Sequence, residues 1–346
     1  MTRLSRRLRT LIVGGVLFVV LLILAIAVPV PYVILSPGPT LNTLGADDQG
    51  NKIIVIKGRE TRATDGHLNL TTVDVSTQSV TIFQALEGWL QHDKVVVPRD
   101  SIYPPGQSTQ QVNAQDTQDF IDSQNSAEAA AFCELGYPKG VAVESFSNGS
   151  KAKGVLQAND RLLSINGAST TTTDQLTAVL DKLTPGSDAT VVVSRAGNDE
   201  TVSVPLISPE KGGTGARLGI TVVQGCIAPF SVDLGLANQI GGPSAGLMFA
   251  LGIIQEVGSN DLTGGRFIAG TGTIDASGAV GPIGGIQLKM IAARRAGATY
   301  FLAPADNCDD VVKATPKGLA IVKVSTLQDA VSDLLAIQGG RSVPGC

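Results

Sequence analysis

The sequence is poor in histidine, in aromatic residues and in charge of either sign. Of its 346 residues, two are histidines, 4% are aromatic and 16% are charged. His67 and His92 lie in no HExxH motif and in no CxxC-type cluster, so we expect no metal site. The sequence also has no GxxxxGKS or GxxxxGKT motif, which excludes a P-loop, and we expect no cofactor. The net charge of −4 offers no basic surface, so no nucleic-acid partner is expected.

The remaining composition is that of a folded chain. Hydrophobic residues make up 43% of the sequence, and 40 residues are glycine. A disordered chain is poor in apolar residues, so this fraction excludes disorder throughout. The length exceeds that of one average domain, and we therefore expect two folded units.

The N-terminal segment has the pattern of a membrane anchor. Four arginines lie within the first ten residues: Arg3, Arg6, Arg7 and Arg9. As a helix, the uncharged residues 11–28 would cover about 27 Å, just enough for a thin bilayer core. Residues 29–35 would add margin, so we expect residues 11–35 to contact membrane lipid. Because arginines favour the cytoplasmic side, the bulk of the chain would lie outside the cytoplasm, on a single-pass anchor in the cell membrane.

A cleaved signal peptide is the alternative for the same segment. Ala25-Ile26-Ala27 resembles a cleavage site. The uncharged stretch is, however, longer than the roughly 7–15 apolar residues of a usual signal peptide, and this length favours the uncleaved anchor. Either interpretation places the folded part outside the cytoplasm.

Four cysteines would then face an oxidising space. They are Cys133, Cys226, Cys308 and Cys346, which allow three pairings. Because Cys226 and Cys308 flank the same C-terminal region, we expect these two to pair. Free buried thiols are the alternative.

Turn-forming residues and apolar alternation divide the first part of the chain. Residues 36–50 are rich in turn formers and predict a linker, and residues 52–57 and 68–75 alternate as strands do. The polar residues 98–118 predict a surface loop, whereas residues 119–135 predict a helix.

Residues 140–207 form a self-contained pattern of short strands and one helix. Strands are expected at 141–143, 160–165, 190–194 and 201–206. Asn166-Gly167 is a strong turn pair. Thr173 can cap a helix that presents one apolar face: Leu176, Val179, Leu180 and Leu183.

This stretch resembles the PDZ domains attached to bacterial proteases. The resemblance rests on QANDRLLSINGAS and PGSDATVVVSRAGNDETVSV, with the helix between them. A PDZ domain binds an extended chain end as an added strand. No clear GLGF-type carboxylate loop is present, so the docking residues stay unassigned, and an inert small β domain is the alternative.

The segment from Gln239 to Val257, QIGGPSAGLMFALGIIQEV, predicts a buried helix with a serine at its start. Gly241-Gly242 would make a tight turn, and Pro243 suits the first helical turn, where its missing N–H costs nothing. Ser244 would then lie beside free backbone N–H groups and the positive end of the helix dipole. A nucleophile with an oxyanion hole can be built there, although serine at such a place is more often only a cap.

A second segment places a lysine on a largely apolar helix face. Gly284-Gly285 precede IQLKMIAARRAG, and Lys289 shares its face with alanines, Ile286 and Met290, whereas two arginines point away. An amine in apolar surroundings loses its proton more easily, because desolvation disfavours the charged form. Lys289 could therefore act as a base near neutral pH. The alternative is a lysine that extends its ammonium into water.

Together these segments resemble the Lon proteolytic domain, which uses a serine–lysine dyad. The resemblance covers residues 212–337 and rests on GGPSAG, on GTGTIDASGAVGPIGGIQLKMIAARRAGA and on YFLAP ahead of Asn307. It implies that Ser244 is the nucleophile, that Lys289 is the general base and that Thr271 orients the lysine amine. The backbone N–H groups of Gly242 and Ser244 would hold the oxyanion. In the family an acidic residue usually stands where this chain has Gly241, which leaves the tuning of activity open.

The whole layout is similar to that of the membrane-anchored, PDZ-containing Lon-like proteases of bacteria. It implies a mixed α+β / α/β fold in which residues 1–35 are the anchor and residues 136–208 are a PDZ-like domain. That domain would be inserted into a protease fold made of residues 36–135 and 209–346, with residues 66–76 as its first strand. The ATPase module of ordinary Lon proteases is absent from the sequence.

We therefore expect a serine endopeptidase that cleaves extended or unfolded polypeptides without ATP. The PDZ-like domain would recruit or gate these polypeptide substrates. By family analogy alone, the chain would form a homo-oligomer, a hexamer. The alternative is a membrane-tethered scaffold or peptide-binding protein whose protease-like domain is inactive.

Overall fold

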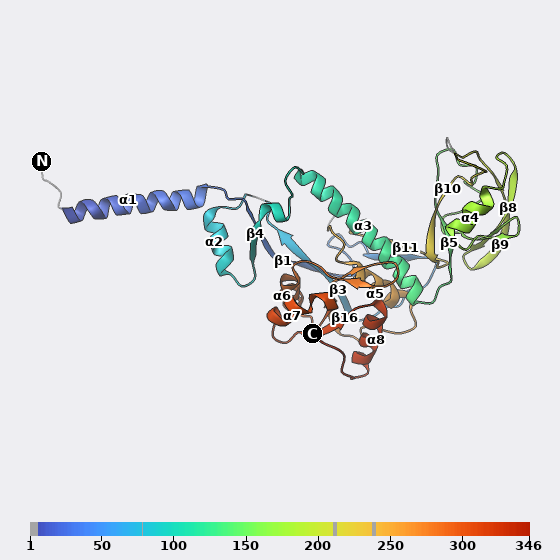
Figure 1. Cartoon of the computed structure of the whole chain (residues 1–346). Helices are drawn as coiled ribbons and strands as arrows, with labels where there is room; N and C mark the ends of the chain where they lie inside the picture. The colour runs from blue at the N-terminus through green and yellow to red at the C-terminus, as the bar shows by residue number, and fades with distance from the viewer. Residues whose placement is uncertain (1–5, 78, 210–212, 237–239) are drawn as a thin grey trace.

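The structure is a computed structural model that describes residues 6–77, 79–209, 213–236 and 240–346 (Figure 1). Arg3 and Gln239, which the sequence singled out, lie outside these ranges. Helix α1 (Arg6–Ala27) projects from the folded part. Within the described residues it is the one helix long and apolar enough to cross a membrane, which is compatible with a single-pass anchor. Residues 32–35, at the end of the segment expected to contact lipid, pair with other strands of the folded part.

A six-stranded sheet forms the centre of the fold, in the order β16-β15-β12-β3-β1-β4. Its strands are β1 (Tyr32–Asn42), β3 (His67–Val75), β4 (Val95–Pro98), β12 (Phe267–Gly270), β15 (Tyr300–Pro304) and β16 (Ala320–Val324). The strands from β3 to β16 run parallel, and β1 runs antiparallel to both of its neighbours. The prediction of a linker at 36–50 is therefore wrong for residues 36–42. The expected strand at 68–75 is confirmed.

Helices cover both faces of this sheet. Successive residues of a strand point to opposite sides, so one strand contributes side chains to two separate cores. Leu302 packs into one core with α3 (Thr109–Glu134), α5 (Gly246–Val257) and α8 (Leu327–Gln338). Its neighbour Phe301 packs into another core with α6 (Ile286–Ala296) and α7 (Cys308–Ala314). The result is a layered α/β architecture.

Helix α3 begins earlier than the sequence predicted. Residues 98–118 were expected to be a loop, yet α3 starts at Thr109 and continues to Glu134. Ser108 and Gln111 form a capping box at its start, which satisfies two backbone donors. Two shorter helices precede it, α2 (Ile82–Leu90) and the 3-10 helix η1 (Arg99–Ser101).

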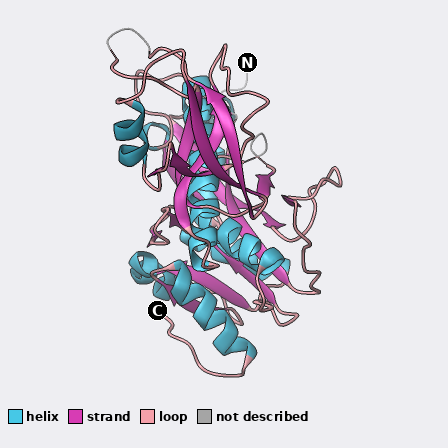
Figure 2. Ribbon diagram, turned by 90° about the vertical axis from the view of Figure 1, so that its right-hand side faces the viewer, coloured by secondary structure: helices cyan, strands magenta, loops and turns pink. Residues whose placement is uncertain are grey.

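A second sheet lies within residues 139–226, which we call the inserted unit. Its antiparallel order is β10-β5-β6-β8-β9, and β7 pairs with β6. The elements are β5 (Lys139–Phe146), β6 (Arg161–Ile165), β7 (Ala168–Ser169), α4 (Thr173–Leu180), β8 (Asp188–Arg195), β9 (Asn198–Pro205) and β10 (Ile220–Cys226). In Figure 2, which is viewed from the right-hand side of Figure 1, the strands of the inserted unit face the viewer.

Two details of the inserted unit differ from expectation. Thr172, not Thr173, caps α4. The unit also continues past the expected boundary at residue 208, because β10 pairs with β5 along Ile220–Cys226. The short sheet of β2 (Ile54–Lys57) and β11 (Ser231–Leu234) lies beyond it, in the main part of the fold.

The cysteines form two disulfides, and the expected pair of Cys226 with Cys308 is wrong. Cys133 is bonded to Cys226, and Cys308 is bonded to Cys346. Cys226 lies at the end of β10, where the chain returns from the inserted unit to the end of α3. It is therefore remote from α7, at whose start Cys308 lies.

Candidate active site

The predicted nucleophile, Ser244, lies in the turn that leads into α5. The helix begins at Gly246 and its N-cap is Ala245, so Pro243 precedes the helix and is not in its first turn as expected. Gly242 has a φ of +80°, a left-handed conformation that favours glycine. Every residue of α5 is buried, so the turn is anchored on the core. Ser244 itself is half-buried.

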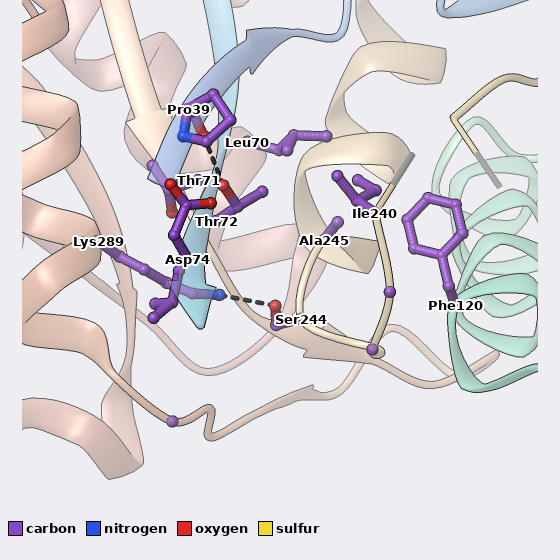
Figure 3. Close-up of a pocket in the computed structure, with 14 residues that line it drawn as sticks. Pro39, Leu70, Thr71, Thr72, Asp74, Phe120, Ile240, Ser244, Ala245 and Lys289 are labelled. Atoms are coloured by element: carbon purple, nitrogen blue, oxygen red, sulfur yellow. Dashed lines mark hydrogen bonds between the residues drawn. The ribbon is translucent and has the colours of Figure 1, made fainter. Parts of the chain in front are cut away.

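Lys289 reaches this turn from the other side of the sheet (Figure 3). It lies on α6, which follows Gly285, itself in a left-handed conformation at φ +68°. Its Nζ lies 2.6 Å from Ser244 Oγ. The same atom donates to Thr271 Oγ1 at 2.9 Å. The structure thus brings together two side chains that are 45 residues apart in the sequence.

Thr271 holds both partners in place. It follows the last residue of β12 and is fully buried. Its hydroxyl accepts from Lys289 and donates to the Ser244 carbonyl at 3.0 Å. The Gly272 N–H donates to the same carbonyl at 2.9 Å. The backbone of Ser244 is therefore fixed relative to the lysine amine.

The surroundings of Lys289 favour its neutral form. Its side chain is 3% exposed, and burial lowers the pKa of its ammonium to about 8. A neutral amine has a lone pair, so at 2.6 Å it can accept the proton of the Ser244 hydroxyl. The arrangement can therefore activate a serine near neutral pH.

The two expected oxyanion donors, the N–H groups of Gly242 and Ser244, differ in their hydrogen bonding. The Gly242 N–H donates to the Asp116 carbonyl at 2.8 Å, so in this conformation it is not available to an oxyanion, contrary to expectation. The N–H of Ser244, the other expected donor, lies at the entrance to α5, near the positive end of the helix dipole.

Helix α3 supplies contacts to the serine turn that the sequence interpretation missed. Ser123, which is buried, donates its hydroxyl to the Pro243 carbonyl at 2.8 Å. Asp116 binds Gly242 through its backbone. The capping pattern Ser-x-x-Gln at 108–111 was the signal that could have placed these residues on a helix.

A pocket of about 370 Å³ opens at the dyad. It is bordered by the serine turn, by β3 and by apolar side chains such as Leu70, Phe120 and Ile240 (Figure 3). Among the residues that the structure describes, no group of three or more His, Cys, Asp or Glu side chains could hold a metal ion.

Comparisons with known proteins assign both units. Residues 237–337 match the Lon protease (S16) C-terminal proteolytic domain, and residues 112–206 match the PDZ domain, a match that begins inside α3. The C-terminal part is 36% identical over 103 residues to Lon protease 1 of Sorangium cellulosum. The aligned stretch covers 29% of this chain and 12% of that protein. It is 34% identical over 96 residues to Lon protease 2 of Bacillus subtilis, covering 28% of this chain and 17% of that protein. The chain thus spans less than a fifth of the length of these relatives.

Among solved structures, the PDZ domain of an SdrC-like protein from Listeria monocytogenes is 25% identical. The match covers 24% of this chain and 87% of that domain, with a TM-score of 0.23. The fold is mixed, as expected, with one apolar helix at its N-terminus. In its C-terminal part the chain is therefore similar to the proteolytic domain of Lon (S16) serine proteases, and the part before it is similar to a PDZ domain.

Proposed function

We propose that the chain is a membrane-anchored serine endopeptidase that uses Ser244 as nucleophile and Lys289 as general base. The observation that carries the proposal is the 2.6 Å separation of Lys289 Nζ and Ser244 Oγ around a buried amine. A lysine held in water would stay charged and could not accept a proton near neutral pH. Thr271 acts as the positioning residue, because its hydroxyl binds both the amine and the Ser244 carbonyl.

In the first step, neutral Lys289 takes the hydroxyl proton of Ser244 while Oγ attacks the carbonyl carbon of a peptide bond. The carbonyl oxygen becomes an oxyanion beside the Ser244 N–H. Full stabilisation calls for a second donor, and Gly242 can supply one if its hydrogen bond to Asp116 opens on substrate binding.

In the second step, the ammonium of Lys289 returns its proton to the leaving amine, and the C–N bond breaks. An ester joins the acyl part of the substrate to Ser244 Oγ. Lys289, neutral again, takes a proton from a water molecule as that water attacks the ester carbon; the C–Oγ bond then breaks, Lys289 returns the proton to Oγ, and the acyl part leaves as a carboxylic acid. The cycle restores the neutral amine and the serine hydroxyl.

The shape of the site favours an extended substrate. β3 pairs with β12 up to Leu70, and among the described residues no strand pairs with β3 on that side beyond this point. Thr71, Thr72, Val73 and Asp74 line the pocket there. A polypeptide could add as a strand along this open edge and present a peptide bond to Ser244. The PDZ domain would hold a second stretch of the same substrate polypeptide or gate the entry of that polypeptide to the site.

The remaining parts of the proposal concern the setting of the reaction. The sequence has no P-loop, and we propose that turnover requires no ATP. α1 would anchor the enzyme in the cell membrane, with the basic N-terminus in the cytoplasm and the protease outside. A homo-oligomer, a hexamer by family analogy, belongs to the same proposal.

Peptide hydrolysis by the full chain in detergent tests the catalytic proposal. With an unfolded protein as substrate and no ATP, Ser244→Ala and Lys289→Met should each lower the turnover rate by roughly a thousandfold or more. The matched controls are Ser332→Ala and Lys313→Met, which change exposed residues on α8 and α7 and should turn over at the parent rate. Turnover that survives in both site variants would reject the dyad.

The rival function is a membrane-tethered scaffold with an inactive protease-like domain. The hydrogen bond that occupies the Gly242 N–H is the observation that favours it. A fluorophosphonate probe separates the two, because only an activated serine attacks it. Labelling that disappears in Ser244→Ala supports the enzyme, and a parent chain that is not labelled supports the scaffold.

A further inference from the structure

Helix α2 exposes its large apolar side chains and buries its small ones. Phe83, Leu86, Trp89 and Leu90 are between 49% and 82% exposed. Ala85 and Gly88 are buried instead. At Gly88 even an added Cβ would lie 2.7 Å from the Val96 side chain, so only the smallest residue allows α2 to pack this closely on β4. An ordinary amphipathic helix of a water-soluble domain has the opposite arrangement.

The exposed side chains form one continuous surface. Phe83, Leu86 and Leu90 follow the i, i+3, i+7 spacing of a single helix face, and Trp89 borders it. Gln84 lies away from this face, whereas the exposed Glu87, four residues after Phe83, borders it on the side opposite Trp89. We call the four apolar side chains the α2 face. An apolar patch of this kind on a folded surface marks a binding site.

The chain connectivity places the α2 face at the base of α1. Directly after α1, Pro29 pairs with Thr81, the N-cap of α2, and the Val30 N–H donates to the Val80 carbonyl at 2.8 Å. The two helices contact each other, and Figure 1 shows α2 on the side of the folded part from which α1 projects. The apolar surface of α1 therefore continues onto the α2 face.

We propose that the α2 face is inserted into the outer surface of the bilayer that α1 spans. This inference rests on the membrane anchorage in the proposed function. Tyr32 and Trp89 support it, because their rings pack edge to face, 6.0 Å apart, and Tyr32 is five residues beyond the end of α1. Tyrosine and tryptophan are enriched at this depth, where one side of the ring is apolar and the other is wet.

The consequence is a fixed orientation of the protease above the membrane. A single helix and a short connection would leave the folded part free to turn about its tether. A second apolar contact, beside the first, restricts that rotation. The active-site pocket and the PDZ domain would then keep a constant height and direction relative to the lipid surface.

Trp89 is the only tryptophan in the sequence and therefore reports on this contact directly. The full chain is reconstituted into vesicles of phosphatidylcholine and phosphatidylglycerol, and vesicle flotation establishes that it is membrane-bound. Trp89 fluorescence is then quenched either by lipid brominated on its acyl chains or by acrylamide in the water. The proposal expects strong quenching by brominated lipid and weak quenching by acrylamide.

A variant pair sharpens the test. Phe83→Glu with Leu90→Glu changes exposed side chains only, so the chain should fold and cleave peptides in detergent as the parent does. In vesicles, its quenching by acrylamide should rise and its quenching by brominated lipid should fall. Val223→Glu on β10, an exposed valine of the inserted unit, is the matched control and should change neither.

Three results would overturn the proposal. Strong acrylamide quenching in the parent would show that the α2 face is in water. Protection from both quenchers would show that a second protein copy covers it. A chain that does not float with vesicles would remove the anchorage, and with it the α2 contact, while a normal peptidase rate in the same sample would leave the catalytic proposal standing.

Discussion

At the scale of single residues, two effects act on Lys289 in opposite directions. Burial removes the ammonium from water and favours the neutral amine. The oxygens of Ser244 and Thr271 accept hydrogen bonds from the ammonium and favour the charged form. Burial prevails, and it lowers the pKa to about 8. The residue can therefore exchange a proton with a serine without any metal ion.

The pH dependence of peptide hydrolysis follows from this balance. Because only the neutral amine accepts the serine proton, kcat/KM should rise with pH and level off above a midpoint near pH 8. The measurement is hydrolysis of a peptide with no titratable groups between pH 6 and pH 10. A flat profile would show that Lys289 is not the base, and a rate that still rises at pH 10 would show that Lys289 titrates as an exposed lysine.

Another desolvated titratable group, the half-buried Glu128, lies away from the dyad. It is on α3 and lines a hollow of about 500 Å³ against β5 and β10 of the inserted unit. Desolvation raises the pKa of its carboxyl to about 7. Because the folded state holds this proton more tightly than the unfolded state, folding is favoured below about pH 4.5, and this contribution is lost as pH rises to about 7.

The substitution Glu128→Gln should remove this dependence. At pH 8 the variant should be more stable than the parent by on the order of 3 kcal/mol, and at pH 4.5 the two should be alike. Chemical denaturation at both pH values measures the difference. Asp122→Asn, at an exposed position of the same helix, is the control. A gain that is equal at both pH values would contradict the titration of Glu128.

The resemblance to the Lon proteolytic domain singled out the three side chains that meet at the site, Ser244, Lys289 and Thr271, whereas residue type and helix position alone left the roles of Ser244 and Lys289 open. It did not predict that the Gly242 N–H binds Asp116. This contact depends on where α3 lies in space, and local sequence patterns carry no such information.

At the scale of elements, α3 acts as a support for the serine turn. Its residue Ser123 binds the Pro243 carbonyl, one residue before Ser244. Its close approach also explains Gly246, where an added Cβ would lie 2.6 Å from Ser123 Oγ. Helix α3 thus fixes both the position of the serine turn and the position of the first residue of α5.

Ser123→Ala should loosen this turn. The Pro243 carbonyl would lose its donor, at a cost of about 1–3 kcal/mol in stability. We expect a lower kcat with little change in KM, because the contact positions the nucleophile and does not bind substrate. Ser126→Ala on the same helix is the matched control. An unchanged kcat in Ser123→Ala, together with labelling of Ser244 at the parent rate, would show that the turn holds its geometry without α3.

The elements that the sequence missed have physical explanations. β1 contains Pro37, Gly38 and Pro39, residues that are typical of a linker. The pairing of β1 with β3 shifts register at this point. Proline is tolerated at such a bulge, and β4 pairs with β1 only along residues 32–35, which leaves the proline side free. The first half of α3 is polar because much of it is exposed to solvent, so apolar periodicity could not reveal it. Strand β3 and helix α6 have clear patterns, and the sequence predicted both.

At the scale of the whole molecule, one disulfide closes the base of the inserted unit. Cys133 lies at the end of α3, before the chain enters the unit, and Cys226 lies where the chain leaves it. The bond therefore joins the two connections through which the PDZ domain is held. The second disulfide, Cys308–Cys346, ties the C-terminal residue to the start of α7.

Removing the first bond should free the PDZ domain without stopping catalysis. Cys133→Ala with Cys226→Ala opens a loop of 93 residues, which costs about 4–5 kcal/mol in the chain-entropy treatment. The dyad touches neither cysteine, so hydrolysis of a short peptide should proceed at the parent rate. Hydrogen exchange should rise at the end of α3 and along β10, and turnover of a long unfolded protein should fall if the PDZ domain delivers it. Cys308→Ala with Cys346→Ala is the matched control, which opens a 38-residue loop and should leave exchange in β10 unchanged. Parent-level protection of β10 in the first variant would show that packing against α3, and not the disulfide, holds the two units together.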